Sequence, residues 1–249
     1  MLNNIMVTFL NNTFLFSILL SSLFSQVGLA IVTKSVGDVE YKYYLDTDFS
    51  TSIKPGTQLF NNDLIKTGSD GFVKFSYLDD GTTIKIHKDT ELYIRGQVNK
   101  QSISKRINMS NGMLKLDVSK QTEDEFKIIT PTSVASVKGT SFILETNDEG
   151  DKFFGFEGIV EVLNKESNQI IKLSKNLKVL SSPDGSINSE VITPLDTELL
   201  DSFSTFEEEP QLDEFSIDEI NNIETTKELR IKVYNSDGIE KIIIIKYNE

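Results

Sequence analysis

Residues 126–162 read FKIITPTSVASVKGTSFILETNDEGDKFFGFEGIVEV, and this stretch decides the fold class. Short apolar runs alternate with polar residues, and glycines or a proline separate the runs. At its centre Phe142 and Leu144 share one side of an extended chain, while Ser141, Ile143 and Glu145 share the other. A period of two residues bounded by glycine turns is typical of half-buried β-strands and not of helices.

The same pattern continues in both directions, from residue 31 to about residue 180. Residues 72–77, FVKFSY, alternate and are followed by Asp80-Gly81, which favours a tight hairpin because glycine adopts the positive φ that the turn needs. Residues 112–118, GMLKLDV, repeat the alternation. Many short strands separated by Gly and Asp turns predict an all-β domain over residues 31–190, built as a sandwich or a solenoid-like β-roll.

Composition narrows the classes of function. The 249 residues carry a formal net charge of −13, which argues against nucleic acid as a partner because phosphate binding needs a basic surface. The same charge argues against electrostatic adsorption to anionic lipid. The chain has no cysteine, so disulfides, thiolate catalysis and Cys-ligated zinc are excluded.

The first 30 residues contain no Asp, Glu, Lys or Arg, and residues 14–20, FLFSILL, form a compact apolar run. Gly28 and Ala30 suit the −3 and −1 positions of a signal-peptidase site, so residues 1–30 are predicted to be a signal peptide cleaved after Ala30. The protein is then periplasmic or secreted. The alternative is an uncleaved inner-membrane anchor over residues 13–32 that leaves the rest facing the periplasm, and only then would the membrane be a partner.

Composition changes after the β region. Between residues 196 and 219 there are ten acidic residues and no Lys or Arg, so residues 191–228 are predicted to be an acidic linker. An amphipathic helix could form within it from the interleaved apolar residues Leu195, Leu199, Leu200, Phe203 and Phe206.

The last segment, residues 229–249, reads as a β-hairpin. Residues 229–234 and 241–247 are strand-like and flank the turn sequence NSDG at residues 235–238. A lone hairpin is marginal in water, so we expect it to pack on the main domain. The alternative is an exposed edge for assembly or a docking tail, because residues 242–245 are all isoleucine.

Motifs for catalysis or for a metal are weak. The only histidine, His87, is expected on the solvent side of a strand, and a second histidine for a metal pair is lacking. Asp79-Asp80 is better explained by turn chemistry than by acid–base work on a sugar. Asp46-x-Asp48 and residues 147–151 offer oxygens to calcium, without the spacing of a known loop. We expect no catalytic residue, no cofactor and no metal site.

Several short motifs occur in a fixed order along the β region. They are LIKTG at residues 64–68, GFVKF at 71–75, DGTTIKI at 80–86, NGML at 111–114, TPTSVASVKGTSF at 130–142 and EGIVEV at 157–162. In this order the region from about residue 37 to residue 187 resembles the FecR domain. The resemblance implies an all-β fold and an extracytoplasmic setting. The motif residues that it marks as structural are Asp80, Gly81, Gly112, Pro131, Gly139, Thr140, Phe142 and Gly158.

FecR-type regulators that control sigma factors resemble a three-part design with a cytoplasmic helix bundle, one membrane span and a periplasmic domain. Only about a dozen residues precede the apolar run here, so the stand-alone exported form is expected. We predict a non-catalytic binding or scaffold module of the bacterial cell envelope that contacts protein or polysaccharide through its β surface. The alternative is an accessory sensor in cell-surface signalling of the FecR type, and a hydrolase with a hidden cleft is a third reading.

Overall fold

The computed structural model describes residues 27–50, 53–100, 102–121, 125–201, 227–234 and 240–247. The chain divides into two compact units, Met1–Phe206 and Glu207–Glu249. The first unit holds the predicted all-β domain, and that fold class is confirmed. Its described strands are β1 (Ala30–Val36), β2 (Val39–Lys42), β3 (Gln58–Leu59), β4 (Leu64–Thr67), β5 (Phe72–Tyr77), β6 (Thr83–Ile86), β7 (Glu91–Asn99), β8 (Ser102–Asp117), β9 (Phe126–Ile129), β10 (Ser133–Val137), β11 (Ser141–Asn147), β12 (Gly150–Glu157), β13 (Val160–Asn164), β14 (Ile170–Leu173), β15 (Leu177–Ser181) and β16 (Ile187–Val191).

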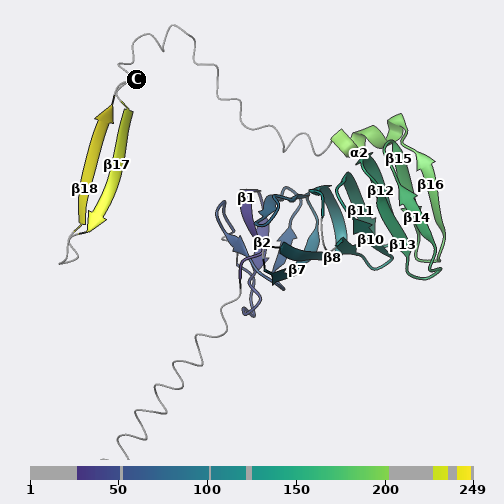
Figure 1. Ribbon diagram of the computed structural model, residues 1–249. Helices are drawn as coiled ribbons and strands as arrows, with labels where there is room; N and C mark the ends of the chain where they lie inside the picture. The colour runs from purple at the N-terminus through teal and green to yellow at the C-terminus, as the bar shows by residue number, and fades with distance from the viewer. Residues whose placement is uncertain are drawn as a thin grey trace, which may run out of the picture. The chain divides into compact units, whose positions relative to one another are not determined.

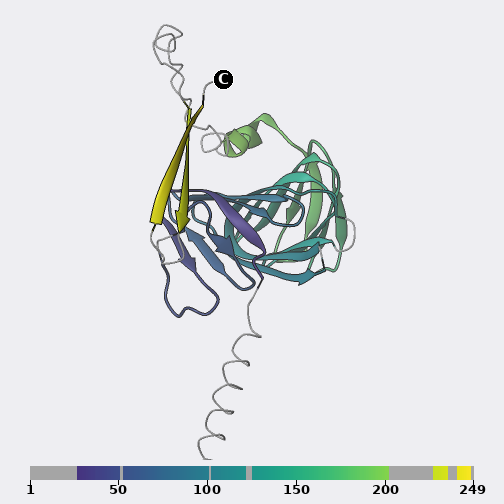
Figure 2. The same cartoon turned by 60° about the vertical axis from the view of Figure 1, so that its left-hand side comes forward.

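The strands form two layers that share the long strand β8 (Figures 1 and 2). The first layer pairs β3, β1, β5, β6, the second half of β8, β11, β12, β15 and β16 in that order. The second layer pairs β2, β4, β7, the first half of β8, β9, β10, β13 and β14. Neighbours run antiparallel except β8 and β9, which are parallel. The chain thus passes repeatedly between two stacked layers, as a solenoid-like sandwich does.

The two layers join at a corner within strand β8, around residue 112. Before the corner its buried residues have odd numbers, with Ile103, Ile107 and Met109 in the core; after it they have even numbers, with Leu114 and Leu116 in the core. The inward face of a strand changes parity when the strand crosses to the opposite layer. The change occurs around the backbone of residue 112, which is the corner between the layers.

One hydrophobic core lies between the layers. Tyr77 of the first layer meets Phe126 of the second, with ring centroids 5.8 Å apart in an edge-to-face arrangement. His87 corrects the sequence prediction, because it is only 3% exposed instead of facing solvent. The reason is local: β6 ends at Ile86, so the alternation that assigned His87 to the solvent side no longer applies there.

The first strand begins earlier than the predicted domain boundary at residue 31. Leu29 and Ala30 are buried, and the Leu29 amide donates to the Leu59 carbonyl at 2.8 Å. The folded domain therefore includes both residues, which the predicted cleavage after Ala30 would remove. The apolar run at residues 14–20 lies outside the described residues. Within the described part of the chain, no helix has the length and apolar character needed to cross a membrane.

The extended amphipathic helix predicted after residue 191 is not supported. The described residues contain a 3-10 turn, η1 (Pro194–Asp196), and one helical turn, α2 (Thr197–Asp201). Leu200 and Ile192 pack against Ile143 and Phe154 on the outer face of the first layer. Phe203, Phe206 and most of the acidic linker lie outside the described residues.

The second unit contains the predicted hairpin. β17 (Lys227–Tyr234) and β18 (Glu240–Tyr247) pair antiparallel over their whole length, from Lys227↔Tyr247 to Tyr234↔Glu240. The connecting residues 235–239 lie outside the described part. That the hairpin packs on the main domain stays a prediction.

Candidate functional site

Several of the sequence motifs meet at one place in the first unit, which we call the motif junction. It consists of the β5–β6 turn at residues 78–82, residues 117–121 at and after the end of β8, the β10–β11 loop at 138–140, and Gly158. The Ser119 hydroxyl donates to the Asp80 carbonyl at 2.9 Å, and the Ser119 amide donates to the Thr82 hydroxyl at 3.1 Å. Segments nearly 40 residues apart in the sequence are thereby joined.

The two loop glycines of the junction lie back to back. Gly139 has φ +119° and Gly158 has φ +73°, in the left-handed region that disfavours side chains. A Cβ atom on Gly158 would lie 2.5 Å from the Gly139 carbonyl oxygen. The close approach of the two backbones explains glycine at position 158, whereas glycine at position 139 is explained by its positive φ.

A cavity of about 580 Å³ opens at the motif junction. Its lining includes the motif residues Gly81, Gly139 and Thr140 and four ionisable residues, Asp117, Lys120, Lys138 and Glu157. Asp117 accepts a hydrogen bond from the Ser141 hydroxyl at 2.7 Å, and Lys138 pairs with Glu125 at 3.0 Å. Mixed charge on an open, polar surface suits the recognition of a polar partner.

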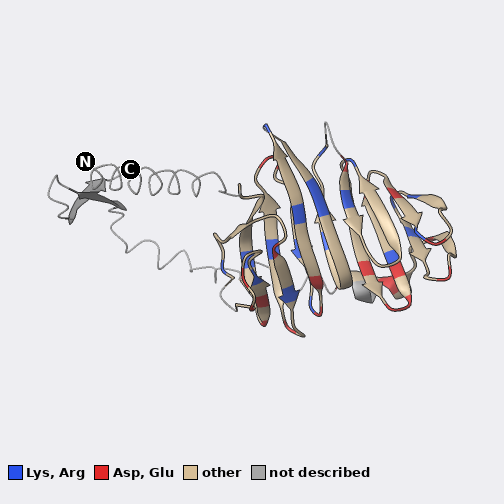
Figure 3. Cartoon of the chain, turned by 90° about the horizontal axis from the view of Figure 1, so that it is seen from below, with Lys and Arg blue, Asp and Glu red and all other residues tan. Residues whose placement is uncertain are grey.

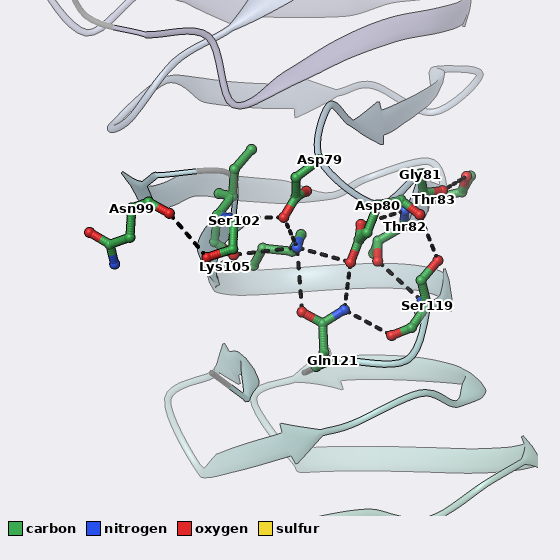
Figure 4. A network of polar contacts seen from close by, with 11 residues as sticks. Asp79, Asp80, Gly81, Thr82, Thr83, Asn99, Ser102, Lys105, Ser119 and Gln121 are labelled. Carbon is green, nitrogen blue, oxygen red and sulfur yellow. Dashed lines mark hydrogen bonds and ion pairs between the residues drawn. The ribbon is translucent and has the colours of Figure 1, made fainter. Parts of the chain in front are cut away.

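Beneath the β5–β6 turn lies a buried lysine (Figure 4). The Lys105 side chain is 1% exposed, and its ammonium lies 2.7 Å from the Asp79 carboxylate and 3.0 Å from that of Asp80. It also donates to the Ile103 carbonyl at 3.3 Å and to the Gln121 amide oxygen at 3.4 Å. We call Lys105, Asp79, Asp80 and Gln121 the lysine centre.

The lysine centre fixes the turn that carries the DGTT motif. Burial opposes ionisation of Asp80, but hydrogen bonds from the Thr82 amide, Lys105 and Gln121 hold its pKa below the usual value. Burial, followed by the nearby carboxylates of Asp79 and Asp80, raises the pKa of Tyr77. The Lys105 ammonium lies 5.5 Å from the Tyr77 ring centroid. Asp79-Asp80 therefore neutralises a buried cation instead of forming an acid–base pair.

The remaining motif residues lie away from the junction. Phe142 is fully buried in the core on β11, Pro131 is exposed in the β9–β10 turn, and Gly112 forms the β8 corner. Sequence reasoning missed Lys105, although its parity with Ile103 and Ile107 placed it on the inward face of β8.

The weak calcium motif at residues 147–151 has a different role in the structure. Asp151 is 2% exposed and accepts hydrogen bonds from the hydroxyls of Thr146 and Thr130, the latter at 2.6 Å. Its carboxylate thus points into the protein. Across the described residues, no three His, Cys, Asp or Glu side chains converge as metal ligands.

Comparison with known proteins agrees with the ordered motifs. Residues 63–161 match the family model described as FecR protein. Two crystal structures of a candidate anti-sigma factor from Parabacteroides distasonis ATCC 8503, at 2.50 and 1.65 Å resolution, are similar in structure, each with a TM-score of 0.46 and 19% sequence identity. The similarity covers 54% and 55% of this chain and 62% and 63% of theirs, less than two thirds of their length. None of the curated proteins matches the sequence.

Proposed function

Because this chain carries a FecR domain, we propose that it is a non-catalytic binding module that acts in cell-surface signalling outside the cytoplasm. The observation that carries the proposal is the family match over residues 63–161, which contain the motifs that build the motif junction. The apolar run at residues 14–20 supports an extracytoplasmic setting.

The motif junction is the surface that we assign to the protein partner. Its loops are held from below by the lysine centre and from the side by paired backbone hydrogen bonds between Val118 and Thr140, at 2.9 and 3.1 Å. A binding surface is effective when its groups are preorganised, because ordering them on association costs free energy. In this proposal the domain senses an envelope protein and a separate protein transmits the signal.

Crosslinking and genetics test the proposal together. A tagged full chain is crosslinked in cells of the source bacterium, and captured envelope proteins are compared with those of the double variant Lys120→Glu/Lys138→Glu, which reverses both cations of the cavity. We expect loss of a specific captured protein. The control is Lys172→Glu on β14, whose ammonium is exposed and pairs with Glu161 at 3.3 Å, away from the cavity.

Deletion of the gene provides the second readout. We expect altered transcription of particular operons, and we expect the cavity double variant to reproduce that change. Unaltered transcription on deletion would exclude the signalling role, and unaltered capture by the double variant would exclude the motif junction as the binding surface.

A further inference from the structure

A row of cations crosses the outer face of the second layer. Arg95 on β7 is paired directly with Arg106 on β8, and Arg106 is paired directly with Lys127 on β9. Ile94, Ile107 and Ile128, adjacent to them along the strands, are fully buried, so the three cations share the outward face. Figure 3 shows Lys and Arg gathered on neighbouring strands of the sheet seen from below. We call Arg95, Arg106 and Lys127 the basic row.

The basic row is unfavourable for the folded chain by itself. Side chains at directly opposed positions of neighbouring antiparallel strands have Cβ atoms about 4.5–5.5 Å apart, and like charges there are destabilising. Within the described part of the chain, no carboxylate pairs with the Arg106 guanidinium. Glu125, which is close enough to Lys127 to sense its charge, is already paired with Lys138 at 3.0 Å. In a chain of net charge −13, three adjacent cations require a specific explanation.

Arg95 is held in place by neutral groups. Its Nη1 donates to the Asn62 side-chain oxygen at 2.7 Å, and its guanidinium lies 5.6 Å from the Tyr93 ring centroid. Its Nε is buried and has no hydrogen-bond partner among the described residues. The side chain is therefore oriented while part of its donor capacity stays unused, and a buried unsatisfied donor is costly.

A cavity of about 470 Å³ lies over this part of the sheet. Arg95 and Arg106 supply its charge, and the other side chains that line it are amides or a hydroxyl: Asn61, Asn62, Gln97 and Ser104. Gln97 and Ser104 are themselves a directly paired position of β7 and β8, next to Arg95 and Arg106 on the same face. The described lining contains no carboxylate and no aliphatic or aromatic side chain.

We propose that this cavity binds a carboxylated sugar of an acidic polysaccharide. The guanidiniums match the two oxygens of a carboxylate, and the amides and hydroxyl can exchange hydrogen bonds with sugar hydroxyls. A peptide site would offer apolar pockets for anchor side chains, which this lining lacks. Cations repeat along the basic row at the strand spacing of about 4.8 Å, which suits a chain that carries a charge on each unit.

The site lies on the outer face of the second layer and is independent of the proposed role of the motif junction. The attraction between the site and an anionic sugar is set by the charges close to the cavity, because charges beyond a Debye length of about 8 Å are screened at physiological salt. The acidic remainder of the chain therefore does not prevent a short carboxylated segment from binding.

The test is calorimetric titration of the full chain with tetragalacturonate, compared with an uncharged oligosaccharide of equal length. We expect measurable affinity for the acidic sugar only. Arg106→Gln should weaken it at least about tenfold, since a charge-assisted pair is lost. Arg95→Lys keeps the charge but loses the planar fork, so it should also weaken binding. Lys152→Gln is the control and should bind as the original chain does, because Lys152 lies on β12 of the first layer, is partly exposed and pairs with Glu145 at 3.1 Å.

Two further probes separate the sugar from other anions. Tetraglutamate carries four carboxylates on a peptide, and inorganic phosphate is a small anion without a sugar; both should bind at least about tenfold more weakly. Equal binding of tetraglutamate would make the site a peptide site and overturn the proposal. Equal binding of phosphate would make it a general anion site and also overturn it, as would unchanged affinity in Arg106→Gln.

Discussion

Removal of the Lys105 ammonium should strongly destabilise the fold. Replacing it with Met keeps most of the side-chain volume but leaves the carboxylates of Asp79 and Asp80 without their cation. Breaking a buried ion pair by removing one partner typically costs about 3–5 kcal/mol, because a charge stays buried and uncompensated. We expect Lys105→Met to lower the free energy of unfolding by that amount in urea titration.

Lys172→Met is the matched control for Lys105→Met. Its ammonium pairs with Glu161 at 3.3 Å, but both side chains are largely exposed. An exposed pair contributes about 0–1 kcal/mol, so the control should be nearly as stable as the original chain. Similar losses in the two variants would show that the lysine centre does not hold the β5–β6 turn.

Asp80 gives the stability a defined pH dependence. Its pKa in the folded chain lies below the ordinary value, so the folded state favours the carboxylate. That stabilisation is fully present above the unfolded pKa of about 3.9 and is lost as the pH falls through the folded value. Asp80→Asn should therefore be less stable at pH 7 and should lose less stability between pH 5 and pH 2.

The role of Asp80 is tested by the difference in stability between Asp80→Asn and the original chain at each pH. Burial raises the pKa of Asp63, which accepts a hydrogen bond from Tyr41 at 2.6 Å, so that group contributes with the opposite sign in both proteins. Melting temperatures at a series of pH values provide the measurement. Parallel curves for Asp80→Asn and the original chain would disprove the assigned role of the carboxylate.

Residue-level reasoning from the sequence succeeded where one face of a strand decides burial. Phe142 and Leu144 were placed together and are both in the core. Lys105 could have been found from the same parity, since it alternates with Ile103 and Ile107. His87 could not, because its burial depends on where β6 ends, and element boundaries are poorly encoded in local pattern.

At the scale of the element, the β8 corner depends on Gly112. Its φ is +108°, and a Cβ atom there would overlap Thr90, with 2.5 Å to the Thr90 Cβ. Gly112→Ala adds this overlap to the backbone strain, which costs of order 1–3 kcal/mol. We expect a clear loss of thermal stability, larger than that of Gly81→Ala.

Gly81 is the control because an added Cβ atom there would experience the backbone strain of a positive φ without overlapping a neighbouring atom. Its φ is +72°, but a Cβ atom there would meet nothing within 4 Å. Gly81→Ala should therefore show only the cost of the left-handed backbone. Equal melting temperatures for Gly81→Ala and Gly112→Ala would mean that the corner can absorb a side chain.

Strand β1 predicts where the mature chain can start. Ala30 is paired with both Leu59 and Tyr77, and Leu29 is 1% exposed. A chain that starts at Ile31 loses both residues from the core, so it should be less stable by about 2–4 kcal/mol than one that starts at Val27. Urea unfolding of the two recombinant chains measures this difference. Equal unfolding midpoints would show that Leu29 and Ala30 are not needed for the fold and that cleavage after Ala30 is compatible with it.

Elements could be predicted where a turn is encoded by adjacent residues. The pairing of strands could not be predicted, because it depends on residues far apart in the sequence. The hairpin turn at Asp80-Gly81 follows from glycine chemistry within a few residues. Strand β8 was seen only in its second half, because its crossing between layers depends on partners from β6, β7 and β11. The basic row could not be predicted from the sequence for the same reason, because Arg95, Arg106 and Lys127 become neighbours only through strand pairing.

At the scale of the whole first unit, the sequence predicted an all-β fold but could not choose between a sandwich and a roll. Each strand records which residues face inward, yet the order of strands in a layer is set by contacts far apart in sequence. The motif junction illustrates the limit. Gly81, Gly139 and Thr140 were marked by the family resemblance, but their convergence on one cavity with residues 117–120, which lie outside the motifs, required the structure.

The shared core makes a prediction about how the first unit unfolds. Repeat solenoids often unfold in segments because each repeat contacts only its neighbours. Here one core cluster includes Phe75 on β5 and Phe153 on β12, and β8 belongs to both layers. We therefore expect Phe75→Ala and Phe153→Ala each to destabilise the entire unit by about 3–5 kcal/mol. Native-state hydrogen exchange should accelerate equally in β5 and β12 in both variants. Acceleration confined to the mutated end would instead identify two independently unfolding halves.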